Sequence, residues 1–182
     1  MESRQAPALP SELRSATLDL FVPAGLVASG AACETESAEY GACRLQLSGR
    51  HVAFRVAKTT PTKVGLFVTV WKRSSTGGEI APIDSEDGVD YVLVHVDQEM
   101  QQGLFVFHRN VLVENGVLAN NGVGGKRAFR VYPPWVLPLA KQAIRTQRWQ
   151  GSYFLPIAPD GTCDTPRLRT LFSIGASNES LE

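Results

Sequence analysis

The segment 125–135, which reads GKRAFRVYPPW, combines three cations with two aromatic residues that carry polar groups. In an extended strand Arg130 and Tyr132 point to one side, whereas Phe129 and Val131 point to the other. The apolar pair can then face the core while a guanidinium and a phenol ring share the opposite face. Cations that pair with phosphates, beside rings on which bases stack, are the components of a single-strand nucleic-acid site.

The residues on either side of this strand extend the pattern. Lys126 and Arg127 lie in a glycine-rich loop, whose backbone can approach a ligand closely. Trp135 follows two consecutive prolines, which end the strand. An alternative stays open, because Tyr132 and Trp135 can equally be core aromatics whose polar tips have partners.

Two further segments carry cations in patterns that suit an anion. A helix is expected over residues 137–155, and Lys141, Arg145 and Arg148 form one stripe on it. Cations on a helix usually mark a solvated face, but such faces carry both signs of charge and this segment has no acid. In FRVAKTTPTKVG, residues 54–65, two lysines lie on either side of three threonines, although the order of a P-loop is missing.

Charges along the chain are sorted into blocks, which the net charge of zero conceals. Residues 40–78 hold seven cations and no acid, residues 79–99 hold seven acids and no cation, and residues 115–159 hold six cations and no acid. Local potential rather than net charge attracts a polyanion, so the two basic blocks favour one if they share a face. The alternative is that folding mixes the blocks into a neutral, salt-bridged surface.

The 182 residues and 43% hydrophobic content fit one domain with a sizeable core. A helical pattern over 13–21 is followed by many strands and then by the helix at 137–155, which predicts an α+β or mixed α/β fold with a central, largely antiparallel sheet flanked by helices. Residues 1–12 and 173–182 are expected to be flexible tails of a domain at 13–172. The strands are expected at 43–49 and 51–57, which form a hairpin, and at 66–72, 90–96, 104–108 and 128–132.

Several classes of protein are disfavoured by composition. No apolar run of about 18 residues exists, so no membrane span is expected, and no secretory signal pattern opens the chain. Three widely spaced cysteines, Cys33, Cys43 and Cys163, predict free thiols rather than a disulfide framework or a zinc site. We therefore expect a cytoplasmic protein with no metal and no cofactor.

Long phrases of the chain resemble the MepB family of bacterial proteins. They are TESAEYGA, FRVAKTTPTKVGLFVTVWKR, GLFVFHRNVL, GKRAFRVYPPW and KQAIRTQRWQ, spread over residues 34 to about 155. The resemblance implies a nuclease-like α/β core, of the restriction-endonuclease type, that binds nucleic acid. The chain departs from the family pattern near Leu66, His108, Ala128 and Val136, and none of these departures removes a cation.

A metal-dependent nuclease or phosphodiesterase is the alternative enzyme. A restriction-type site needs carboxylates that hold Mg²⁺ or Mn²⁺ beside a lysine, and no lysine here has an acid two residues before it. Glu39, Asp84, Asp90 and Lys58 form a degenerate site only if the fold gathers them. A third alternative is an interaction module, in which the acidic block binds a basic patch on a partner or on a second copy.

The sequence favours a binding protein over an enzyme. We expect it to contact mainly the phosphates of DNA or RNA, with stacking from two aromatic residues and weak sequence preference. The expected contacts are Arg55, Lys58, Lys63, Lys72, Arg73, Lys126, Arg127, Arg130, Tyr132, Trp135, Lys141, Arg145 and Arg148.

Overall fold

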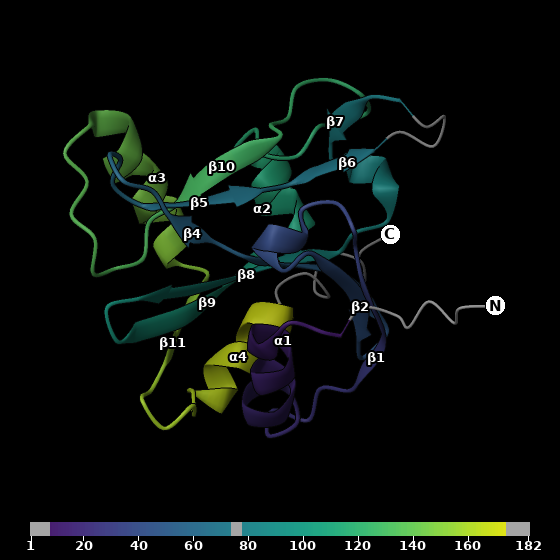
Figure 1. Cartoon of the computed structure of the whole chain (residues 1–182), viewed down its shortest axis with the longest axis vertical. Coiled ribbons are helices and arrows are strands. Elements are labelled where there is room, and N and C mark those ends of the chain that lie inside the picture. Colours follow the sequence, from purple (N-terminus) through teal and green to yellow (C-terminus); the bar gives the residue numbers. More distant parts are fainter. Residues whose placement is uncertain (1–7, 74–77, 174–182) are drawn as a thin grey trace.

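Six strands form the central sheet, and Figure 1 shows them across the middle of the molecule. The computed structural model describes residues 8–73 and 78–173. All neighbouring strands run antiparallel except β3 and β8, which run parallel. The spatial order is β1 (Ala28–Cys33), β2 (Cys43–Leu47), β3 (Arg50–Val56), β8 (Tyr91–Gln98), β9 (Gln101–His108) and β11 (Phe154–Ile157).

A second, smaller sheet covers one face of the central sheet. Its order is β10 (Ala128–Val131), β5 (Leu66–Thr69) and β4 (Lys58–Thr59), all antiparallel. The chain continues from β5 into a two-stranded ribbon of β6 (Trp71–Arg73) and β7 (Ile80–Pro82).

Helices cover both faces of the central sheet (Figure 1). On the face away from the small sheet lie α1 (Ser11–Ala16), the π-helical turn η1 (Thr17–Phe21) and α4 (Thr165–Ser173). On the same side as the small sheet lie α2 (Arg109–Glu114) and α3 (Lys141–Gly151). Two short 3-10 turns complete the described elements, η2 (Ala38–Tyr40) and η3 (Ser85–Asp87).

The alternation of side chains in the central strands divides the core into two layers. In β8, Tyr91 and Leu93 pack against α1 and α4, whereas Val92 and Val94 pack under the small sheet. Since successive residues of a strand point to opposite faces, a continuous apolar run is required when both faces are covered. The segment 91–96 comes close to that requirement, because all six of its side chains are buried and His95 is the one imidazole among them.

The fold class predicted from the sequence is confirmed. The chain is a mixed α+β domain with a mostly antiparallel central sheet, and β2 and β3 form the expected hairpin. The predicted tails 1–12 and 173–182 lie largely outside the described residues, and α1 begins within the first of them, at Ser11. Within residues 8–73 and 78–173, no helix is both long enough and apolar enough to cross a membrane.

The helix predicted over 137–155 is wrong in its extent. It spans only Lys141–Gly151, and Phe154 and Leu155 belong to strand β11, which pairs with β9. Helix α4 was not predicted from the sequence, although Asp164 followed by Pro166 is a typical signal for the start of a helix. The carboxylate of Asp164 accepts a hydrogen bond from the amide of Arg167 at 3.1 Å, as an N-cap residue does.

The outer strands of the central sheet are irregular. In β1 the register against β2 shifts between Ser29 and Ala32, and most of the strand is exposed. At the other edge β11 contains Pro156, which is paired in register with Gly103 of β9.

Gly103 is expected to be indispensable to this packing. A β-carbon at that position would lie 2.1 Å from Cζ of the Phe154 ring, which is buried against Phe105 and Trp135. We expect Gly103→Ala to lower the free energy of unfolding by about 1–3 kcal/mol, measured by urea denaturation. The matched control is Gly151→Ala at the end of α3, where a β-carbon meets nothing within 4 Å. A Gly103→Ala protein as stable as this control would contradict the packing described.

Candidate nucleic-acid interface

A cavity of about 770 Å³ lies between the small sheet and helix α3. One wall is strand β10 with the loop that precedes it, and the other wall is the face of α3 that turns towards the sheet. No Asp or Glu is among the residues that line it in the described part of the chain. The lining residues are Lys63, Asn115, Val117, Lys126, Phe129, Arg130, Tyr132, Ala140, Gln142, Ala143, Arg145, Thr146 and Trp149.

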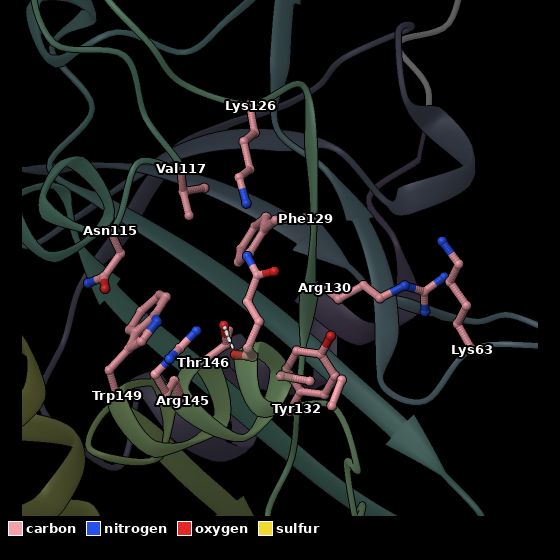
Figure 2. Close-up of a pocket in the computed structure, with 13 residues that line it drawn as sticks. Lys63, Asn115, Val117, Lys126, Phe129, Arg130, Tyr132, Arg145, Thr146 and Trp149 are labelled. Carbon is pink, nitrogen blue, oxygen red and sulfur yellow. Dashed lines mark hydrogen bonds between the residues drawn. The ribbon is translucent and has the colours of Figure 1, made fainter.

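Four cations from both basic blocks reach this cavity. Figure 2 shows the Lys126 ammonium and the Arg145 guanidinium directed into it on one side of Phe129, with Arg130 extending towards Lys63 on the other side. Lys63, Lys126 and Arg145 form no side-chain ion pair or hydrogen bond with other described residues, whereas Arg130 donates to the Gly65 carbonyl at 3.2 Å and to Oγ1 of Thr60 at 2.8 Å. Three uncompensated cations therefore face one hollow.

Two half-buried aromatic rings border the same space. Trp149 packs its ring on Phe107, with the ring centres 5.5 Å apart, so the indole is anchored in the core. The Tyr132 ring lies against Gly65, where an added β-carbon would approach within 2.7 Å of the ring. The glycine there has a φ of +82°, which other residues rarely adopt, so both the turn and the close contact require it.

The side chain of Gln150 joins the two walls of the cavity. It is fully buried, its Oε1 accepts from the Tyr132 amide at 2.8 Å, and its Nε2 donates to the Arg130 carbonyl at 3.0 Å. One side-chain amide from α3 thus provides hydrogen-bond partners for two backbone groups along β10 and just after it. Sequence reasoning missed this residue; the available signal was a polar residue seven positions after Ala143, on the face of the helix that meets the core.

The loop that presents Lys126 is held by Asp84. One oxygen of the Asp84 carboxylate accepts from the Gly122 amide at 2.6 Å, and the other accepts from the Glu86 amide at 3.0 Å. These hydrogen bonds, the Glu86 bond first, lower the pKa of Asp84 below its ordinary value. Asp84 therefore has a structural role here rather than the metal-binding role considered for it from the sequence.

Arg55 is not available to a phosphate, contrary to the expectation from the sequence. Its guanidinium is 1% exposed and donates to the carbonyls of Thr69 and Phe54 at 3.2 and 2.9 Å and to the Glu34 carboxylate at 3.3 Å. Burial lowers its pKa from the ordinary value. Arg55 instead ties β3 of the central sheet to β5 of the small sheet.

Much of the first basic block is neutralised by acids. Lys72 pairs with Asp87 at 2.6 Å, and Arg73 forms an ion pair with Glu36. These two cations of β6, which were expected to contact phosphates, therefore already hold carboxylates, and neither lines the cavity. Folding therefore mixes charges around Lys72 and Arg73, whereas Lys63 and the cations of the second block form no ion pair with an acid in the described part of the chain.

The remaining expected contacts divide into three kinds. Lys58 lies over the Tyr40 ring, with Nζ 4.9 Å from its centre, and does not line the cavity. Exposed cations outside the cavity are Arg127, Lys141 and Arg148. The Trp135 indole donates to Oε1 of Gln98 at 3.0 Å and packs on the core, so the core interpretation of this residue is the right one.

The residues considered for a nuclease site do not come together. Asp90 precedes β8 and accepts from the His51 amide at 2.8 Å, at the start of β3. Lys58 lies beyond the other end of β3, seven residues from His51, and the five steps from His51 to Val56 alone span about 16 Å. Glu39 lies next to Tyr40 at the Lys58 end, and the described residues contain no cluster of three potential metal-ligating side chains.

The architecture defines a class of α+β protein in which a six-stranded sheet carries a second sheet, with a basic cavity between that second sheet and a helix. The model of the MepB-like family matches residues 34–156, a range that contains every residue lining the cavity, and the chain belongs to this family. It is similar to the protein in a structure described as the crystal structure of MepB, with 38% sequence identity and a TM-score of 0.67. The match covers 71% of this chain and 86% of that chain. Among curated proteins, none matches the sequence.

Replacing Gln150 is expected to separate the cavity walls. Gln150→Leu leaves the Tyr132 amide and the Arg130 carbonyl without their partner, and we expect a loss of about 1–3 kcal/mol in the free energy of unfolding. Chemical denaturation measures it. Gln142→Leu is the control, because this exposed glutamine on the same helix makes no side-chain hydrogen bond to other described residues. Equal stability of the two variants would contradict the role of Gln150.

Protonation of Asp84 is expected to release the loop before Lys126. Because the folded pKa is lowered, the contribution is complete above the ordinary value of 3.8 and is lost as the pH falls through the folded pKa. Asp84→Asn should remove this part of the acid dependence of the melting temperature and should speed hydrogen exchange at the Gly122 amide. The prediction fails if the variant and the wild type lose stability in parallel below pH 4.

Proposed function

We propose that the chain binds single-stranded nucleic acid in the cavity between β10 and α3. The observation that carries this proposal is the gathering of Lys63, Lys126, Arg130 and Arg145 around one hollow that no carboxylate lines in the described part of the chain. Cations held close together repel one another, and an arrangement without local compensation is favourable when a polyanion occupies it. Nucleic acid supplies such charges at regular spacing along its backbone.

The aromatic rings support a nucleic acid over an isolated anion. Trp149 and Tyr132 border the same cavity as the cations, and each ring is held by packing, Trp149 on Phe107 and Tyr132 against Gly65. A ring held in this way offers a stacking surface to any base and loses little conformational entropy on binding. Phosphate contacts dominate such a site, so sequence preference is weak.

The two alternatives considered from the sequence gain less support. A nuclease needs Glu39, Asp90 and Lys58 in one place, whereas Asp90 and Lys58 lie at opposite ends of β3. An interaction module needs a free acidic block, whereas three of the seven acids of that block, Asp84, Asp87 and Asp90, are engaged within the chain. We place the binding activity in the cytoplasm, where the three free thiols would persist.

Fluorescence anisotropy with a labelled oligonucleotide tests the proposal directly. We expect the wild type to bind with a log–log salt slope of about −3, since four contacts each contribute about 0.7 for a single strand. The double variant Lys126→Ala with Arg145→Ala should weaken binding at least about tenfold and reduce the slope by about 1.4.

A control double variant removes equal charge from the same helix. Lys141→Ala with Arg148→Ala deletes two exposed cations that lie outside the cavity, and its affinity should stay within about twofold of the wild type. Equal weakening by both double variants would assign binding to a diffuse basic surface and overturn the cavity. Absence of binding at 50 mM salt, a condition that favours phosphate contacts, would overturn the function itself.

A further inference from the structure

Two cysteines that are ten positions apart in sequence face each other across the edge of the central sheet. Cys33 ends β1 and is paired in register with Cys43 at the start of β2. Their sulfur atoms lie 3.3 Å apart. Both thiols are free.

The backbone geometry at this position suits a covalent bond between them. The Glu34 amide donates to the Ala42 carbonyl at 2.8 Å, which makes Cys33 and Cys43 a non-hydrogen-bonded pair of the antiparallel ladder. In such pairs the two β-carbons approach most closely, within the range that a disulfide spans. The sulfur atoms need to approach by about 1.2 Å to reach the bonded distance of about 2.05 Å.

One of the two thiols can be reached from solvent. Cys33 is half-buried and lines a second cavity, of about 470 Å³, whereas Cys43 is fully buried behind it. Three acidic residues also line this cavity, Glu12, Glu34 and Glu39. Glu34 is paired with Arg44 and Arg55. The carboxylates of Glu12 and Glu39 form no ion pair with other described residues, so they disfavour an anionic oxidant such as oxidised glutathione and leave access to a neutral one.

We propose that Cys33 and Cys43 form a reversible intramolecular disulfide when the protein meets a hydroperoxide, with Cys33 as the attacking thiol. The inference is independent of nucleic-acid binding, because the pair lies on β1 and β2, away from the cavity between β10 and α3.

The reaction balances in two steps. The Cys33 thiolate attacks one oxygen of hydrogen peroxide, the O–O bond breaks, and the leaving hydroxide takes up a proton to form water. The sulfur of Cys43 then attacks the sulfenic acid on Cys33, and the displaced hydroxide leaves as water with the proton of the Cys43 thiol. Two thiols lose two electrons in total, and one peroxide is reduced to two waters.

The environment assigns the order of these steps. Burial and the hydrogen bond between the thiols raise the pKa of Cys43 to about 12, so this group keeps its proton at neutral pH. A thiol of this kind reacts slowly with an oxidant in solution but is well placed to resolve a sulfenic acid that forms beside it.

Peptide mapping tests the proposal on the full chain. Trypsin leaves both cysteines in one peptide, since no Lys or Arg lies between Arg14 and Arg44, whereas Glu-C cleaves after Glu34, Glu36 and Glu39, between them. After treatment with hydrogen peroxide and alkylation, the unreduced digest should contain the two fragments as one disulfide-linked species. Dithiothreitol should separate them.

Variants and a thermal measurement complete the test. Cys33→Ser and Cys43→Ser should each abolish the linked species, and Cys163→Ser should leave it unchanged. The oxidised wild type should melt about 5–10 °C higher than the reduced form, a readout that does not depend on any variant folding. Oxidation of Cys33 to a sulfinic acid without the link, a link to Cys163, or an unchanged melting temperature would each overturn the proposal.

Discussion

The buried amide of Gln150 is the interaction on which the basic cavity depends. It satisfies one donor and one acceptor on the edge of β10 and thereby fixes α3 at a set distance from that strand. Arg130 and Tyr132 extend from the strand, and Arg145 and Trp149 extend from the helix, so the relative placement of all four follows from this contact. Leaving a buried amide unpaired is costly, which makes the arrangement rigid before any ligand arrives.

Charge is distributed by the fold in two different ways. In the first basic block, acids from elsewhere in the chain hold most of the cations, and Glu34 serves both Arg44 and the buried Arg55. A buried guanidinium needs several hydrogen bonds to offset its desolvation, and Arg55 obtains them from both sheets. In the second block no cation forms an ion pair with an acid within the described residues, although Arg130 donates to the Gly65 carbonyl and to Oγ1 of Thr60. The charge pattern of the sequence does not show which cations are structural and which are exposed.

How far the sequence predicts the structure depends on whether the signal is local. Alternation and apolar runs correctly indicate β8, β9 and the hairpin of β2 and β3. The burial of each face of a strand determines which of its own residues are apolar, so this signal is local in the sequence. The end of α3 was misjudged, since the pairing of Phe154 with Phe105 is a long-range contact that overrides a helical period. Arg55 was misassigned for the same reason, since its partners Thr69 and Glu34 are distant in sequence. The four cations that line the candidate site were predicted from the sequence, whereas Gln150, which fixes α3 against the strand that carries Arg130, was not.

The irregular outer strands carry a consequence for the behaviour of the protein at high concentration. An open strand offers a row of amides and carbonyls to which a strand from another molecule can add, which is the usual start of fibril growth. In this sheet the register shift interrupts the ladder of the edge strand β1, and Pro156 removes an amide donor from the other edge strand, β11. Neither edge strand offers an uninterrupted row of backbone groups. The sheet therefore resists edge-to-edge association with other molecules, even though its interior strands are strongly hydrophobic.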